Sequence, residues 1–482
     1  MINSWAIAFC GLIWLLGNLG AQLLAQTYPK YYNKNEAQQL RRGQFEFSEF
    51  SSQNSNLYLS LEEALAQPIQ NVKRLRLSGK QLEAIPNKVF ELTYLEELDL
   101  SFNNIKAIPA ELIQLYKLKS LNISHNQIES PLIDSTFWQN KQLESLWLNH
   151  NRLDAIPEAI GNLSELRYLN LSHNQIFFGS SPGRSDYLGL IVPYPEVGTT
   201  YPRTFLHKVQ AQEVITNISQ RYQISVRDLM RINQLEKPIL RQGQVLRIPI
   251  LINPFPEKTL KNGYWVVPFT AQGYNAYSYN GFCHLGKLRQ LEYLDLSHNQ
   301  INYLPWSFYH LSRLKVLNLN HNQLKELPWE IQGLKSLEYL FLSYNQFDQL
   351  PDYIGKLENL ASLHLDYNFQ KNVGKFSISD EIIQLKKLTR LHLSGNKMDE
   401  FPIQISTLVN LKRLTLADAN LYTLPPDIRN LTQLSELHLQ ENALEELPSE
   451  MGELNSLRKL FLQKNILKSL PSQLNNLTNL DT

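Results

Sequence analysis

The sequence predicts an α/β solenoid: a curved stack of repeats with a parallel sheet on its concave face, into which a small α+β domain is inserted. Three observations predict it. A leucine pattern recurs every 23 residues, an asparagine returns at a fixed place in most copies, and one copy is interrupted by a long segment of different composition. The formal net charge of +1 over 482 residues gives no indication of a nucleic-acid partner, which would require a basic excess.

The repeat is defined by the pattern L-x-x-L-x-L-x-x-N-x-L-x-x-L-P. Its fourth and sixth positions alternate as one face of a short strand must, and the apolar residues after the proline have helical or 3₁₀ spacing. One unit cannot bury its own leucines, so the units must stack. The copies start at Val72, Leu95, Leu118, Leu143, Leu166, Leu291, Leu314, Leu337, Leu360, Leu388, Leu411, Leu434 and Leu457. Another copy begins at Leu480 and stops, from which we expect the natural chain to be longer.

Asparagine fills the ninth position of every copy except two, which carry Lys80 and Ala419. An amide at this place is expected to bond the backbone of its own and neighbouring turns, which would otherwise be buried without partners. The asparagines are Asn103, Asn126, Asn151, Asn174, Asn299, Asn322, Asn345, Asn368, Asn396, Asn442 and Asn465.

These residues resemble the leucine-rich-repeat family over residues 72–176 and 282–482. The resemblance implies a curved horseshoe with the strands on the concave face, and protein–protein recognition as its task. Cysteine-rich caps, usual in extracellular animal and plant members, are missing, which favours a bacterial type or simple polar capping. The segment Leu57 to Gln70 predicts a capping helix, with Ser60 as N-cap and Glu63 three residues on.

Aromatic residues gather at positions that we expect to face the concave side, namely the second, third, fifth, seventh and eighth of each copy. Exposed aromatics on one face are typical of an interface core. The alternative is that the rings only fill gaps between strands. The predicted protein-binding residues are Trp147, Tyr168, Tyr293, Tyr339, Phe341, Tyr344 and Tyr367.

Histidines also align along the stack. Imidazoles about 5 Å apart on neighbouring strands are able to hold a metal or to form a pH-sensitive stripe. We favour a simpler interpretation, in which the motif S-H-N-Q is inherited by duplication, and we expect no metal site and no cofactor. The eighth position carries His125, His150, His173, His298 and His321, and the fifth carries His364, His392 and His438.

An insertion separates Leu166 from Leu291 by 125 residues where 23 are expected. Residues 177–204 and 251–281 are rich in Gly, Ser, Pro and Tyr and are predicted to be linkers. Leu188 to Val192 and Trp265 to Val267 are candidates for two short strands that pair. Residues 205–250 predict a strand, two helices and a final strand, a βααβ domain.

This inserted domain resembles the LysM family along its whole length. The residues in register with the family pattern are Ile218, Tyr222, Val226, Leu229, Asn233, Leu235, Leu240, Gly243, Gln244, Leu246, Ile248 and Pro249. The resemblance implies binding of N-acetylglucosamine-containing glycans, such as peptidoglycan or chitin, between two loops. The implied glycan-binding residues are Gln212, Glu213, Val214, Ile215, Leu235, Ile239 and Leu240.

The first of these loops departs from the family. Gln212-Glu213-Val214 stands where the family commonly has Gly-Asp-Thr, so the flexible glycine and a hydroxyl able to bond an acetamide are both missing. Weak glycan binding and an inert LysM-like spacer therefore both remain open.

The N-terminal segment, Trp5 to Ala25, is a nearly unbroken apolar run. We expect residues 1–25 to be a signal peptide cleaved after Ala25, with an uncleaved membrane anchor as the alternative. Residues 26–71 then form an N-terminal segment ending in the capping helix. The protein is expected to be secreted or held in a cell envelope, in a bacterial periplasm or on a bacterial surface, and to touch a membrane only if the segment is retained. Cleavage removes Cys10 and leaves Cys283 without a disulfide partner within the chain.

An enzyme is not predicted. The motifs H-E-x-x-H, G-x-x-x-x-G-K-[ST] and C-x-x-C are absent, and the match to G-x-S-x-G at Gly179 to Gly183 (GSSPG) falls in a segment that we interpret as a linker, so we assign no catalytic residue. Three functions remain: an envelope adaptor that binds both a glycan and a protein, a protein-interaction solenoid with an inert insert, and a membrane-tethered receptor-like protein.

Overall fold

A computed structural model describes residues 57–177, 285–304, 306–350, 352–368 and 375–481, together with the strands and a few single residues of the insert. The predicted signal segment, both cysteines and most of the two linkers lie outside the described residues. The chain forms two compact units, one of residues 1–180 with 280–482 and one of residues 181–279. Within the described ranges, no helix is both long and apolar enough to cross a bilayer.

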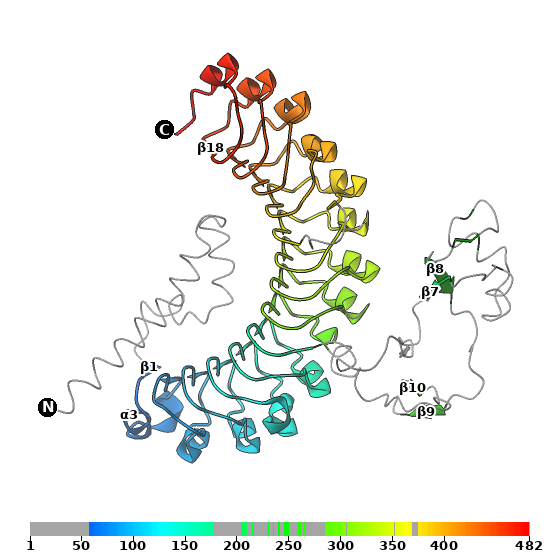
Figure 1. The fold of residues 1–482 in the computed structure, drawn as a ribbon. Coiled ribbons are helices and arrows are strands. Elements are labelled where there is room, and N and C mark those ends of the chain that lie inside the picture. Colours follow the sequence, from blue (N-terminus) through cyan, green and yellow to red (C-terminus); the bar gives the residue numbers. More distant parts are fainter. Residues whose placement is uncertain are drawn as a thin grey trace. The chain divides into compact units, whose positions relative to one another are not determined.

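The first unit is built on a parallel sheet of 14 strands. Each strand except the first occupies the third to fifth positions of a repeat, and Figure 1 shows them along the inner side of a curved array. The strands are β1 (Leu57–Tyr58), β2 (Arg74–Arg76), β3 (Glu97–Asp99), β4 (Ser120–Asn122), β5 (Ser145–Trp147), β6 (Tyr168–Asn170), β11 (Tyr293–Asp295), β12 (Val316–Asn318), β13 (Tyr339–Phe341), β14 (Ser362–His364), β15 (Arg390–His392), β16 (Arg413–Thr415), β17 (Glu436–His438) and β18 (Lys459–Phe461).

Short 3₁₀ helices line the outer side of the array (Figure 1). Most begin directly after the repeat's proline, whose fixed φ suits the residue before a helical turn. They are η1 (Ile69–Asn71), η2 (Asn87–Glu91), η3 (Ala110–Gln114), η4 (Ser130–Leu132), η5 (Ser135–Gln139), η6 (Glu158–Asn162), η8 (Trp306–His310), η9 (Trp329–Gly333), η10 (Asp352–Lys356), η11 (Asp380–Gln384), η12 (Ile403–Thr407), η13 (Pro426–Asn430), η14 (Ser449–Glu453) and η15 (Ser472–Asn476). The predicted strand-and-turn repeat is therefore confirmed.

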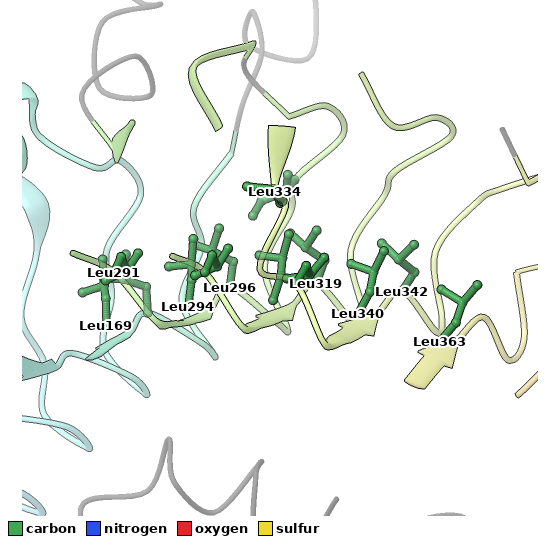
Figure 2. Close-up of a cluster of buried hydrophobic side chains, with 14 of the residues drawn as sticks. Leu169, Leu291, Leu294, Leu296, Leu319, Leu334, Leu340, Leu342 and Leu363 are labelled. Carbon is green, nitrogen blue, oxygen red and sulfur yellow. The ribbon is translucent and has the colours of Figure 1, made fainter. Parts of the chain in front are cut away.

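The core consists of rows of leucines that run through successive repeats. Leu169, Leu294 and Leu340 occupy the same strand position, are fully buried, and stand on the same side of the sheet in Figure 2. Neighbouring strands pair in register, so each leucine packs on its equivalents in the next repeats. Burying such a side chain stabilises the fold by about 1.5–3 kcal/mol, and stacking is the only way for one repeat to obtain it.

The asparagine ladder bonds the backbone as predicted. The Asn322 amide nitrogen donates to the carbonyls of Leu296 and Leu319, both at 3.0 Å. Its oxygen accepts the Ile301 N–H at 3.0 Å. One side chain thus joins two repeats and satisfies polar groups that no water reaches.

The insertion leaves the array continuous. Strands β6 and β11 pair directly, with Leu169 opposite Leu294. The Gln300 N–H donates to the Ile176 carbonyl at 2.9 Å, so the pairing continues beyond the strands. The insert therefore leaves and re-enters the array within one repeat.

At the N-terminal end the capping helix is shorter than predicted. Strand β1 adds to the sheet first, and helix α3 (Leu61–Leu65) follows. Ser60 is the N-cap as expected, and its hydroxyl accepts the Glu63 N–H at 3.2 Å. Leu57 and Tyr58 form a strand because the unpaired edge of β2 offers them backbone partners.

The second unit contains two antiparallel strand pairs. Strand β7 (Thr204–Lys208) pairs with β8 (Val245–Pro249), as the predicted βααβ order requires. Strand β9 (Thr259–Lys261) pairs with β10 (Tyr264–Val266), placing Trp265 opposite Leu260. The segment Leu188 to Val192 lies outside the described residues, so its suggested pairing with Trp265 to Val267 stays a prediction.

Candidate functional site

An apolar cluster lies on the concave side of the sheet, separate from the leucine core. Tyr293, Val316 and Phe341 are its buried members, and Tyr168 and Tyr339 pack against them half-buried. They come from the neighbouring strands β6, β11, β12 and β13, which pair in register. Side chains at equivalent positions therefore meet laterally and form one continuous patch, which we call the concave cluster.

The structure brings together four of the seven predicted protein-binding residues in the concave cluster. Trp147 lies on β5, between Asn122 and Asn170 of the adjacent strands. Its ring, like those of Tyr293 and Phe341, is buried and not exposed as expected, since neighbouring strands cover it. Binding by these residues stays a prediction.

The other two predicted residues, Tyr344 and Tyr367, belong to a different feature. Together with Phe102 at the other end, they extend the row of five eighth-position histidines into a stack of eight rings, which we call the ring ladder. Neighbouring centroids are 3.9–4.2 Å apart along the ladder, except 5.0 Å between the tyrosines. Its members are Phe102, His125, His150, His173, His298, His321, Tyr344 and Tyr367.

The backbone explains why these rings stack. Every eighth position, from Gly79 to Lys464, has a left-handed φ between 52° and 73°. Because each repeat turns in the same way just after its strand, the side chains leave in parallel at the spacing of the strands. The sequence analysis grouped Tyr344 and Tyr367 with the concave positions, whereas the left-handed φ of the eighth position places them in the ring ladder.

The ladder histidines are neutral at pH 7. Burial and, to a smaller extent, the neighbouring imidazoles together lower the pKa of His173 to about 2. Burial likewise lowers the pKa of His125 to about 3 and those of His150 and His298 to about 4. A charge on one ring is unfavourable both inside the stack and beside other charged rings.

Charged residues flank the concave cluster along the sheet. Toward the C-terminal end, Glu436 forms an ion pair with Arg413, and His438 lies 3.4 Å away. Burial raises the pKa of Glu436, but the hydrogen bond from His438 and the charge of Arg413 outweigh this and lower it to about 2. Toward the N-terminal end, Arg74 contacts Glu97 at 2.9 Å.

In the insert, the described residues show a small packed interior. Val209, Ile215 and Leu246 are buried. Among the predicted glycan-binding residues, Ile215 thus packs inside the module, whereas Leu235 and Leu240 are half-buried. Gln212, Glu213, Val214 and Ile239 lie outside the described residues.

Comparisons with known proteins agree with both units. A family model described as leucine-rich repeat matches residues 70–128 and 132–176, and one described as leucine-rich repeat region matches 269–404. A LysM domain model matches residues 207–249. No match was found among curated proteins.

Solved structures with similar folds include bacterial proteins. A leucine-rich-repeat protein of Leptospira interrogans has 27% identity and a TM-score of 0.55, over 89% of this chain and 93% of that one. An internalin of Listeria monocytogenes has 19% identity and a TM-score of 0.54, over 88% of each chain. The Toll–Spätzle complex of Drosophila has 18% identity and a TM-score of 0.54, over 84% of this chain and 41% of that one.

Proposed function

Because this chain is a member of the leucine-rich-repeat family and carries a LysM domain, we propose that it is an exported, non-catalytic adaptor of the cell envelope. In this proposal the concave face binds a protein partner, and the LysM domain binds a glycan that contains N-acetylglucosamine. Both families are binding modules, and the scaffold presents them on one chain.

The concave cluster carries the protein-binding half of the proposal. It places aromatic and apolar side chains side by side on a sheet face that the leucine core does not need. Ion pairs of Arg74 with Glu97 and of Arg413 with Glu436 lie on either side along the sheet. An apolar centre with a charged periphery is the usual arrangement of a protein interface.

Tyr339 is the residue on which we expect a partner to depend most. Its ring is half-buried, and the Arg390 guanidinium lies over it, 5.5 Å from the ring centroid. Tyrosine and arginine are the residue types that contribute most at interfaces. A photo-crosslinking amino acid at position 339 is expected to capture a partner in the native envelope, whereas the same amino acid at Tyr422, exposed and outside the strands, is not.

The glycan half is tested by sedimentation with insoluble peptidoglycan and chitin. We compare the full chain with a chain lacking residues 181–279, whose array should remain intact because β6 and β11 pair directly. We expect the full chain alone to sediment. A companion with Gln212→Gly and Val214→Thr should bind more tightly, because it restores the family's loop chemistry.

An inert insert is the second candidate function, favoured by the altered loop and by the burial of Ile215. If neither the native chain nor the companion sediments with either glycan, the adaptor proposal fails and an interaction solenoid with a spacer is left. Export is tested separately by the N-terminal residue of the mature protein. A start at Gln26 supports cleavage, and a retained N-terminus indicates an anchor.

A further inference from the structure

Two histidines on the concave side face each other across neighbouring strands. His364 on β14 and His392 on β15 are direct partners in register, and their rings stack with centroids 4.0 Å apart. Asp366 lies two residues beyond His364, on the same face of the chain. One ligand atom of each of the three residues lies within 4.8 Å of the other two. Among the residues that the structure describes, this is the only such group of histidine, cysteine and carboxylate side chains.

The group is buried, which distinguishes it from a chance cluster on the surface. His364 and His392 have no exposed area, and Asp366 is 7% exposed. Burial raises the pKa of the Asp366 carboxyl, while the nearby His364 imidazole lowers it. An ionised carboxylate in such a place is costly unless it is hydrogen-bonded or binds a cation.

Other buried carboxylates on the concave side of the sheet have a different arrangement. Asp99 and Asp295 occupy the fifth position, and each accepts the backbone N–H of the serine two residues later. In the repeat of β14 the order is reversed, because an imidazole takes the fifth position and the carboxylate the seventh. The next repeat adds a second imidazole beside the first.

Neighbouring polar groups hold His364 and Asp366 in place, and His392 stacks on the His364 ring. The Ser362 hydroxyl is 2.9 Å from Nε2 of His364, which leaves Nδ1 as the nitrogen for a ligand. The Asp366 carboxylate accepts the Ser394 N–H at 2.8 Å. Such outer contacts are how proteins fix metal-binding imidazoles and carboxylates. Ser362 itself is fully buried, so it is inaccessible to a substrate and does not act as a nucleophile.

We propose that His364, Asp366 and His392 bind one divalent transition-metal ion of the zinc class. Two imidazole nitrogens and one carboxylate oxygen suit zinc and its neighbours, whereas calcium and magnesium prefer oxygen ligands only. The ion ties β14 to β15 where the spacing between equivalent residues increases from 23 to 28. It therefore reinforces the array at the repeat from Leu360 to Leu388, which is five residues longer than the common 23.

The test uses the full chain, stripped with a chelator and then incubated with excess zinc chloride and desalted. We expect one zinc per chain by elemental mass spectrometry and a higher melting temperature. His392→Gln and Asp366→Asn should each weaken zinc binding at least about tenfold. Cobalt(II) in place of zinc should give visible absorption bands that both variants lose.

The matched control is His438→Gln. His438 occupies the same fifth position on β17 and is also buried, but it lies beside Glu436 and outside the group. It should bind zinc like the native chain. The proposal is overturned if the folded native chain retains no zinc. It is also overturned if His392→Gln and Asp366→Asn still bind zinc normally while His150→Gln with His298→Gln in the ring ladder does not.

Discussion

The two ends of the array use the same backbone position in different ways. From Phe102 to Tyr367 the eighth position carries stacked rings, whereas from Gly395 to Lys464 it carries glycine or charged side chains. The left-handed φ is the same throughout. The turn therefore does not require aromatic residues, and the ring ladder is an additional source of stability confined to the repeats on both sides of the insert.

The largest expected difference between the two ends is in their response to acid, which should destabilise the ring-ladder repeats much more than the charged repeats. The pKa values of the ladder histidines are lowered below the ordinary histidine value of 6.5, so the stability that this shift represents is complete above that pH and is lost as the pH falls toward 4 and below. After discounting for partial exposure, we expect a loss on the order of 5 kcal/mol. Hydrogen exchange at pH 7 and pH 4 should show protection lost first in residues 118–330 and last in 411–461. Equal loss at both ends would contradict it.

Removal of one central ring is the next largest effect. His173 stacks on His150 and on His298 across the insertion, so His173→Ala removes two ring contacts and destabilises by about 1–3 kcal/mol. Denaturant unfolding at pH 7 measures this. His173→Phe, which keeps the stack and removes the titration, should retain most of the stability and reduce the acid sensitivity. A fully stable His173→Ala chain would show that the stack contributes nothing.

A substitution next to the last ring of the ladder, Tyr367, should destabilise the protein by a smaller amount. A Cβ at Gly395 would lie 2.2 Å from the Tyr367 ring, and φ there is +73°. Gly79 has a similar φ of +67° with no atom within 4 Å, so it isolates the backbone cost. We expect about 1 kcal/mol for Gly79→Ala and about 2 kcal/mol for Gly395→Ala, by thermal unfolding. Equal losses would mean that Tyr367 moves aside freely.

Removing a charge from the eighth position at the C-terminal end of the array should change the stability very little. Lys464 contacts Glu441 at 2.7 Å, but both side chains are well exposed. Lys464→Met is expected to leave the unfolding midpoint unchanged within error, because solvent screens such pairs. A clear decrease would indicate that the charged repeats depend on their eighth position as much as the ring ladder does.

Features that recur in each repeat could be predicted well from the sequence, whereas contacts between side chains of neighbouring strands could be predicted only poorly. The leucine spacing, the asparagine contacts and the site of insertion follow from the phase of one repeat, as at Leu169 and Asn322. The burial of Tyr293 and Phe341 depends instead on neighbours in other strands. The ladder extends to Phe102, Tyr344 and Tyr367 because the φ of the eighth position turns them alike, and that φ is not visible in the leucine pattern. Their shared phase in the alignment of copies was the available signal.

The group of His364, Asp366 and His392 was also missed as a unit. The histidines were noted as a row, but the carboxylate is two residues away in sequence and only the pairing of β14 with β15 brings all three together. The segments S-L-H-L-D and R-L-H-L-S carry the signal when they are aligned on their leucines.

The direct pairing of β6 with β11 also means that the array has a natural cutting point. Residues 57–177 and 285–481 each end in a strand edge that matches the other, with Tyr168 opposite Tyr293 and His173 stacked on His298. Two separately produced polypeptides should therefore recognise each other at this edge and reassemble one sheet. The same junction offers a place to exchange the insert for another domain, or to open new chain ends, without changing the register of any repeat.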